Sequence, residues 1–256
     1  MIPKTGVTKR SWKRPGRKAI LIALILFILF LTATCAIYLG NYYRADEIAM
    51  AVLTTPADGV TIFEQKNERI TFIPDEPIAG LVFYPGGKVQ YESYAPLMEA
   101  CAGKGILCVL LHMPFNLAVF DAAAADAIIG DYPEITDWFV GGHSLGGAMA
   151  SSYAARHSDE LQGLILLAAY PTKNLNDSGL RVVSVYGAED GVLNMDNYTT
   201  AKEYFPDDTA EYLIEGGNHA YFGSYGNQKG DGTAGNSNIE QIHQAAAIVS
   251  EFMTAG

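Results

Sequence analysis

The stretch Gly142-His143-Ser144-Leu145-Gly146-Gly147 decides the fold expected for this chain of 256 residues. An apolar run, residues 136–140, leads into it, and a segment of small residues with helical character, residues 146–156, leads out. A serine held on a sharp strand-to-helix turn needs neighbours without side chains, and the glycines on either side of Ser144 meet that need. The pattern therefore predicts a strand, a tight turn that exposes Ser144, and a helix.

Apolar runs and helical patterns alternate on both sides of this turn. Residues 79–84 and 106–111 are continuous apolar runs, which are typical of strands buried on both faces of a parallel sheet. Further strands are expected at residues 60–63, 69–73, 161–168, 181–186 and 210–214, and helices at 91–102, 117–129, 195–204 and 239–253. The first two short strands would form an antiparallel start. The alternation predicts an α/β fold, a mostly parallel sheet with helices on both faces and no large lid.

The N-terminal part of the chain differs in charge from the rest. Seven of the 17 basic residues precede residue 19, and all 28 acidic residues follow residue 40, so 10 basic and 28 acidic residues give the remainder a net charge of −18. Residues 19–39 are uncharged, and as a helix they would span roughly 31 Å, close to the thickness of a bilayer core. We expect a cytoplasmic basic tail (1–18), a transmembrane helix (19–40), a short helix or stalk (41–58) and one extracytoplasmic domain (59–256).

A cleaved signal peptide and a lipoprotein cysteine are the two alternatives to an uncleaved anchor. A cleaved signal peptide usually has an apolar region of ~7–15 residues that ends in small residues. Here the run is longer and ends Cys35-Ala36-Ile37-Tyr38. A lipoprotein cysteine at Cys35 would require apolar and small residues where Thr32 and Thr34 stand. Because the domain is strongly acidic, it should repel nucleic acid and anionic lipid head groups, so the basic tail is interpreted as a topology signal.

Cys101 and Cys108 are the only cysteines outside the apolar run, and in an oxidising compartment they could form a disulfide. One ends a helical pattern and the other lies inside an apolar strand, which favours two buried thiols. The sequence contains no C-x-x-C motif and no His/Cys cluster with metal-ligand spacing. No metal and no cofactor are therefore expected.

A serine hydroxyl is a poor nucleophile until a base takes its proton, and the base needs an oriented carboxylate. The strand 181–186 is followed by Glu189 and Asp190, and the strand 210–214 is followed by His219. Catalytic residues of open α/β sheets gather at these strand ends, in the order serine, acid, histidine. Ser144, one of the two carboxylates and His219 are therefore the expected nucleophile, acid and base. His143 should point into the packing behind the turn.

The oxyanion of a tetrahedral intermediate requires N–H donors. One is expected from the backbone of Leu145, and another from Gly87 or Lys88 in a loop that could also be a plain Pro-Gly turn. Residues 113–120 and 221–225 are the expected pocket walls, with His112, Met113, Phe115, Tyr221 and Phe222 as candidate substrate contacts, although a structural role is the alternative for His112. The interval 170–180 is too short for a helical lid, so an open, shallow pocket is expected.

Residues 80–252 resemble the α/β-hydrolase superfamily, particularly small, often membrane-anchored bacterial serine hydrolases related to dienelactone hydrolases. The resemblance is carried by FYPGGKV at 83–89, MPFNLA at 113–118, the turn around Ser144, GAEDG at 187–191 and GGNHAYFG at 216–223. By position it implies Ser144 as nucleophile, Asp190 rather than Glu189 as acid, and His219 as base. Dienelactone hydrolases carry cysteine as the nucleophile, so their lactone substrate is not expected here.

Together these features predict a membrane-anchored, extracytoplasmic serine hydrolase that cleaves a carboxylic ester or a related acyl bond through an acyl-enzyme. An acyltransferase with the same triad and a catalytically inactive binding module of the same fold are the alternatives. The expected partners are a small-molecule acyl substrate and the membrane, with no nucleic acid. The sequence leaves the oligomeric state open.

Overall fold

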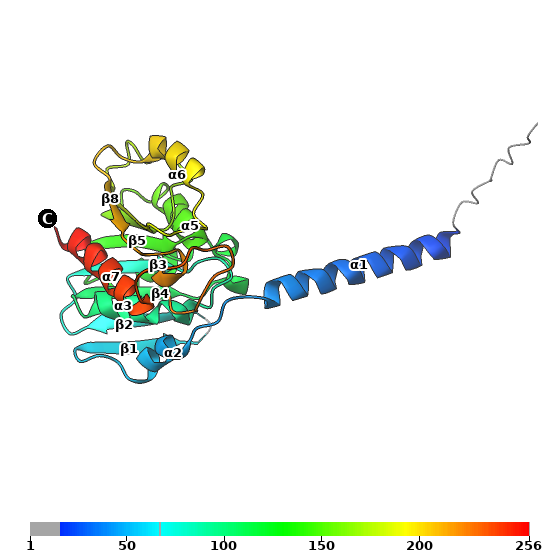
Figure 1. Ribbon diagram of the computed structural model, residues 1–256, viewed down its shortest axis with the longest axis horizontal. Helices are drawn as coiled ribbons and strands as arrows, with labels where there is room; N and C mark the ends of the chain where they lie inside the picture. Colours follow the sequence, from blue (N-terminus) through cyan, green and yellow to red (C-terminus); the bar gives the residue numbers. More distant parts are fainter. Residues whose placement is uncertain (1–15, 67, 256) are drawn as a thin grey trace, which may run out of the picture. The chain divides into compact units, whose positions relative to one another are not determined.

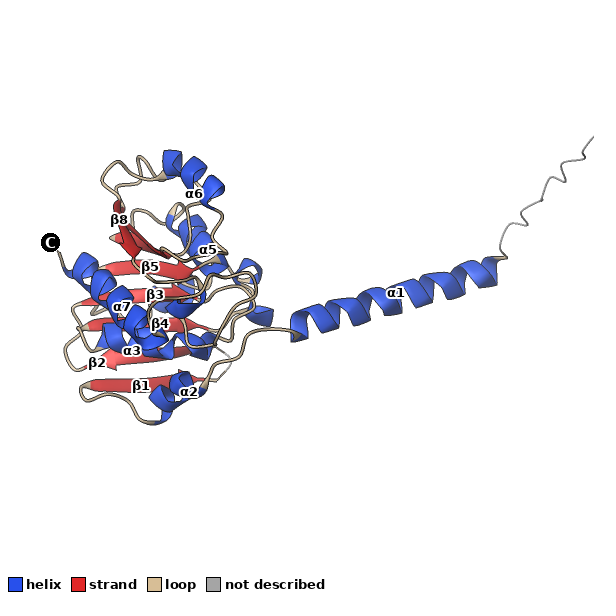
Figure 2. Cartoon of the chain, viewed as in Figure 1, coloured by secondary structure: helices blue, strands red, loops and turns tan. Residues whose placement is uncertain are grey.

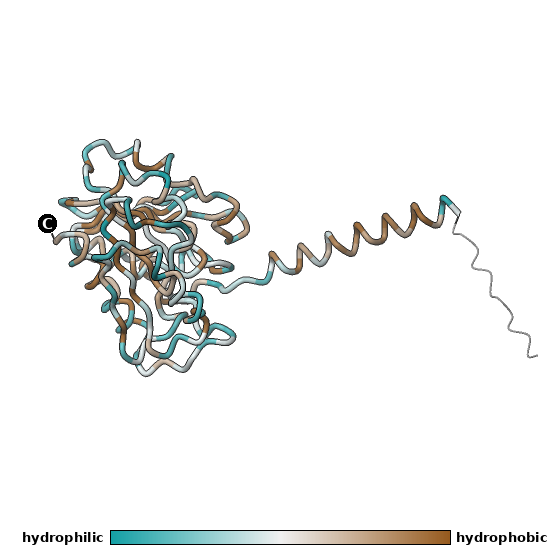
Figure 3. The backbone as a smooth tube through the Cα atoms, turned by 90° about the horizontal axis from the view of Figure 1, so that it is seen from above, coloured by the Kyte–Doolittle hydropathy of each residue, from teal (hydrophilic) through white to brown (hydrophobic). Residues whose placement is uncertain are grey.

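The computed structural model describes residues 16–66 and 68–255, so most of the predicted basic tail lies outside the described residues. The chain divides into two compact units, residues 1–41 and 42–256. In the first unit, helix α1 (Arg17–Gly40) has 24 residues and is long and apolar enough to cross a membrane. Figure 3 shows the hydrophobic residues of α1 along nearly its whole length. Its length and composition are compatible with the expected membrane anchor.

The second unit is built on one eight-stranded sheet with the order β1-β2-β4-β3-β5-β6-β7-β8 (Figures 1 and 2). The strands are β1 (Val60–Gln65), β2 (Arg69–Pro74), β3 (Ala79–Tyr84), β4 (Ile106–Leu111), β5 (Trp138–His143), β6 (Gly163–Leu167), β7 (Arg181–Gly187) and β8 (Ala210–Ile214). β2 pairs antiparallel with β1 and β4, and all other pairs are parallel. The predicted α/β class and the antiparallel start are confirmed.

Helices cover both faces of the sheet. They are α2 (Glu47–Thr54), α3 (Ala95–Ala102), α4 (Asp126–Ile129), α5 (Leu145–Ala154), α6 (Met195–Ala201) and α7 (Asn238–Thr254), with 3₁₀ turns η1 (Tyr91–Tyr94), η2 (Pro114–Asn116), η3 (Ala118–Phe120), η4 (Lys202–Tyr204) and η5 (Ala220–Phe222). Leu81 and Phe83 belong to one core cluster with α3 and α7, whereas Val82 and Tyr84 belong to a second cluster with α5. This alternation is the consequence of a strand buried on both faces.

The prediction of a helix at residues 117–129 is wrong. Only η3 and the four residues of α4 are helical there. The hydroxyl of Tyr84 donates a hydrogen bond to the carbonyl of Ala122 (3.0 Å) and accepts one from the N–H of Ala125 (3.2 Å). Because a side chain from β3 takes up these backbone groups, the alanine-rich segment forms turns despite its helical propensity.

Residues 41–58 contain the short helix α2, and the segment lies on the domain instead of forming a separate stalk. The N–H of Tyr43 donates to the carbonyl of Lys88 (2.8 Å), and the carbonyl of Tyr43 accepts from the N–H of Gln90 (2.8 Å). Helix α2 packs against α3. Cys101 and Cys108 are buried and free, as expected.

Candidate active site

Ser144 stands between β5 and α5 in a strained backbone conformation, with φ 53° and ψ −122°. A non-glycine residue in such a region costs of order 1–3 kcal/mol. The close approach of two backbones explains the strain, since a Cβ on Gly146 would lie 2.1 Å from the carbonyl oxygen of Tyr84, and one on Gly142 would lie 2.6 Å from it. The N–H of Ser144 donates to the carbonyl of Leu167 (2.9 Å). The predicted strand, turn and helix are confirmed.

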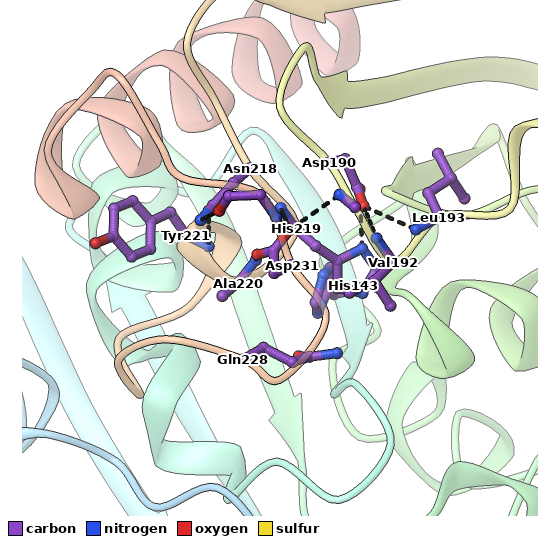
Figure 4. A network of polar contacts seen from close by, with 12 residues as sticks. His143, Asp190, Val192, Leu193, Asn218, His219, Ala220, Tyr221, Gln228 and Asp231 are labelled. Atoms are coloured by element: carbon purple, nitrogen blue, oxygen red, sulfur yellow. Dashed lines mark hydrogen bonds and ion pairs between the residues drawn. The ribbon is translucent and has the colours of Figure 1, made fainter.

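Asp190 and His219 follow the ends of β7 and β8 and meet beside this turn (Figure 4). The Nδ1 of His219 lies 2.9 Å from the Oδ2 of Asp190, and each side chain is only 2% exposed. The Oδ1 of Asp190 accepts from the backbone N–H groups of Val192 (2.8 Å) and Leu193 (2.7 Å). Since a carboxylate only accepts, Nδ1 donates to it. Glu189 is exposed, so the structure pairs Asp190 with the histidine.

The other imidazole nitrogen of His219 is the one available to accept a proton. With the proton on Nδ1, Nε2 carries the lone pair, and within the described part of the chain it is buried without a hydrogen-bond partner. Ser144 and His219 border the same cavity. Hydrogen bonds between a nucleophile and its base are often long before substrate binds. The arrangement can deliver a base to a serine hydroxyl.

Two backbone N–H groups beside Ser144 can bind an oxyanion. Leu145 is the first residue of α5, so its N–H has no partner within the helix, and the helix N-terminus favours negative charge. Gly87 lies against it, because a Cβ on Gly87 would be 2.8 Å from the Cδ2 of Leu145. Across residues 16–66 and 68–255, neither N–H makes a hydrogen bond. Leu145 and Gly87 therefore remain candidates for the oxyanion hole.

The prediction of Lys88 as an alternative donor is wrong. Its N–H donates to the carbonyl of Asn116 at 2.7 Å. Lys88 has φ 61°, and Phe115 and Asn116 also have positive φ values of 57° and 55°. These left-handed conformations lie in the loop after β3, which contains Lys88, and in the loop after β4, which contains Phe115 and Asn116. The amide of Lys88 is directed to the loop after β4.

A buried hydrogen-bond network supports the loop that contains Gly86 and Gly87. The hydroxyl of Tyr94 accepts from the N–H of Gly86 (3.0 Å) and lies 2.8 Å from the Nδ1 of His143. His143 is 1% exposed, behind the turn as expected. Burial lowers the pKa of His143 well below its ordinary value, and the neighbouring imidazole of His219, at 4.6 Å between ring centres, lowers it further. A neutral His143 thus supports the loop instead of acting as a base.

A cavity of about 290 Å³ borders the serine. Its walls are formed by α5 and by the segments that follow β6 and β7. The lining residues are Ser144, Leu145, Ala148, Ala168, Ala169, Tyr170, Thr172, Val192, Leu193, Asn194 and His219. Residues 170–180 contain no helix or strand, in keeping with the expected absence of a lid. Among the described residues, no group of three or more His, Cys, Asp or Glu side chains could hold a metal ion.

None of the five residues predicted to contact substrate lines this cavity. Met113 and Phe222 are buried in the core, and the ring of Phe115 is 59% exposed. His112 packs edge-on against Tyr91 and borders a separate cavity, and Tyr221 borders another. The expected walls at residues 113–120 and 221–225 are therefore corrected to those after β6 and β7. The rule that located the pair Glu189 and Asp190, namely that functional residues follow strand ends at one sheet edge, could have found these walls too.

Comparisons with known proteins identify a matching family and similar folds. Residues 80–243 match the model of a family described as the alpha/beta hydrolase family. A search of curated proteins gave no match. The fold is similar to TT1662 from Thermus thermophilus (13% identity, 77% of this chain and 99% of that chain, TM-score 0.57) and Est1E from Butyrivibrio proteoclasticus (15%, 77% and 100%, 0.54). It is also similar to a predicted CIB-like hydrolase from Thermoplasma acidophilum (12%, 75% and 97%, 0.51).

The turn should tolerate no side chain at position 146. Gly146→Ala is expected to lower the free energy of unfolding by about 3 kcal/mol or more, because the new Cβ would meet the backbone oxygens of Tyr84 and Pro85 at 2.1 and 2.4 Å. Chemical denaturation measures the effect. Gly130→Ala is the matched control, since nothing lies within 4 Å of its added Cβ. Equal unfolding midpoints for the two variants would contradict the close approach.

Proposed function

Because the chain belongs to the α/β hydrolase family, we propose that it is a serine hydrolase that cleaves a carboxylic ester or a related acyl bond. The proposed triad is Ser144, Asp190 and His219. The observation that carries the proposal is the buried 2.9 Å contact between Asp190 and His219 beside the cavity that Ser144 borders. The Nε2 of His219, unpaired within the described chain, is then available to the serine hydroxyl.

The reaction follows from these positions. Nε2 of His219 takes the proton of Ser144 as Oγ attacks the acyl carbon, and the oxyanion that forms accepts hydrogen bonds from the N–H groups of Leu145 and Gly87. The intermediate collapses when the imidazolium gives its proton to the leaving alcohol, which leaves an acyl-enzyme. Water, deprotonated by the same imidazole, then attacks the acyl carbon. The bond from the acyl carbon to Oγ breaks, the imidazolium returns its proton to Oγ, and the acid is released. Asp190 stays ionised and stabilises the imidazolium.

The triad can be tested with a fluorophosphonate probe and an ester substrate. Ser144→Ala should abolish labelling, and His219→Ala or Asp190→Asn should lower kcat by roughly 10³-fold or more, because the triad acts as a unit. Glu189→Gln is the matched control for the acid, since its exposed side chain lies one residue away. A nearly silent Asp190→Asn with a crippled Glu189→Gln, or continued labelling of Ser144→Ala, would overturn the assignment.

The cavity limits the acyl chain that we propose for the substrate. About 290 Å³ of space, walled mainly by alanine, valine and leucine side chains, suits a short acyl group. Each additional buried CH₂ contributes up to ~0.8 kcal/mol, or about fourfold in kcat/KM, until the space is filled. A short acyl ester is therefore the proposed substrate class.

Chain-length dependence tests this limit. p-Nitrophenyl acetate or butyrate should be preferred, with kcat/KM flat or falling by octanoate. Ala148→Leu, which narrows the cavity, should impair butyrate hydrolysis more than acetate hydrolysis. Met149→Leu is the control, because Met149 lies on the same helix but does not line the cavity. A steady rise to palmitate below the micelle concentration would disprove the limit.

We also propose that α1 anchors the chain, with the N-terminus in the cytoplasm and the domain outside. The support is the apolar length of α1, the seven basic residues at positions 4–18 and the absence of acidic residues before residue 41.

Fractionation and protease accessibility test the anchor and its orientation. The full chain should stay in the membrane fraction after alkaline carbonate extraction, because an apolar spanning helix is not held by charge. Protease added to intact cells should digest the domain. Release by carbonate would refute the anchor, and protection until lysis would refute the orientation.

A further inference from the structure

Asp231 lies in the loop between η5 and α7, and within the described residues its carboxylate accepts hydrogen bonds only from backbone N–H groups (Figure 4). Oδ1 accepts from Gly191 (3.1 Å), His219 (3.1 Å) and Gly232 (2.8 Å). Oδ2 accepts from Ala220 (2.8 Å). Hydrogen bonds to an ionised carboxylate are roughly twice as strong as those between neutral groups. One side chain thus joins three separate parts of the backbone.

The joined positions are adjacent to the proposed acid and base. Gly191 directly follows Asp190, and the N–H of His219 itself is one of the donors. The loops after β7 and β8 are therefore connected by the backbone hydrogen bond from Glu189 to Gly217 (2.8 Å), by the imidazole of His219 on Asp190, and by Asp231 across their backbones. Asp231 thereby fixes the backbone from which the side chains of Asp190 and His219 project.

The backbone of the Asp231 loop packs closely against the segment that carries Asp190. A Cβ on Gly232 would lie 1.9 Å from the carbonyl oxygen of Glu189, and one on Gly191 would lie 2.7 Å from the carbonyl oxygen of Gly230. Asn218 adds a further tie, because its Nδ2 donates to the carbonyl of Gly232 (3.1 Å). The loop is thus held against both the acid and the base segments.

We propose that Asp231 is a positioning residue for the serine hydrolase reaction. It keeps His219 in register with Asp190 and keeps Nε2 directed at the serine, without touching substrate. The inference rests on the proposed function. Asp231 does not line the cavity at Ser144 but borders a separate one with Asn218 and Tyr221. Its loss should therefore change the catalytic step more than substrate binding.

Asp231→Asn is the informative substitution because it keeps size and removes the charge. An amide oxygen can replace only one of the two carboxylate oxygens. If it replaces Oδ1, the amide nitrogen faces the N–H of Ala220, donor against donor. A shift of about 1 Å in a catalytic group can cost 10²-fold in rate, so kcat should fall roughly 100-fold with KM changed less than about twofold.

The experiment uses the full chain in detergent with p-nitrophenyl butyrate as substrate. The values of kcat and KM and the unfolding temperature are measured for the wild type, Asp231→Asn and Glu189→Gln. The control removes a charge from the acid loop through an exposed side chain and should leave all three unchanged. Proton NMR follows the downfield signal of the His219 Nδ1–H, identified by its absence in His219→Ala. Asp231→Asn should broaden or shift this signal.

Each outcome decides the proposal. Wild-type kcat in Asp231→Asn, an unchanged imidazole signal, or a loss of kcat only in step with unfolding would overturn it. If Asp231→Asn does not fold, Asp231→Glu, which keeps the carboxylate, carries the test and should show a lowered kcat at unchanged KM. Failure of the proposed function would appear differently, as a wild-type chain that neither hydrolyses the ester nor labels at Ser144, while the NMR signal still reports on Asp231.

Discussion

The contact between two backbones at the turn after β5 is the constraint on which the remaining structure depends. Gly142 and Gly146 let the turn press on the carbonyl of Tyr84 at the end of β3. This close backbone contact holds Ser144 in its strained conformation and places the N-terminus of α5 beside the loop of Gly87. The proposed nucleophile and the candidate oxyanion donors therefore take their positions from the same backbone contact.

Much of the fold could be predicted from sequence because its strands are local patterns. The bounds of β3, β4 and β8 agree residue for residue with the predicted strands. A continuous apolar run predicts β3 and β4 because both are buried on both faces of the sheet. The segment 117–129 could not be predicted, because one hydroxyl from a distant strand decides its backbone. Local propensity predicts an element only where no tertiary hydrogen bond competes with it.

In the site, too, some features follow from local sequence patterns and others depend on tertiary contacts. Chain order and strand ends indicated Ser144, His219 and the pair Glu189 and Asp190. The resemblance favoured Asp190, and the structure brings Asp190 and His219 into contact. The amide of Lys88 and the role of Asp231 depend on loops far apart in the chain, so spacing gave no indication of either. The only sequence signal for Asp231 is a glycine on each side, which is compatible with close backbone packing but equally common in ordinary loops.

In the part of the chain that the structure describes, β8 is the last strand of the sheet and pairs only with β7, and three of its five residues are exposed. His219 is therefore carried by an edge, the part of a sheet where local opening needs the least free energy. Detachment of β8 would withdraw Ile214 from the core cluster, but the loop that carries His219 is also held by hydrogen bonds to Asp231 and Gln241. These hydrogen bonds therefore determine how far local opening of this edge reaches the contact between His219 and Asp190.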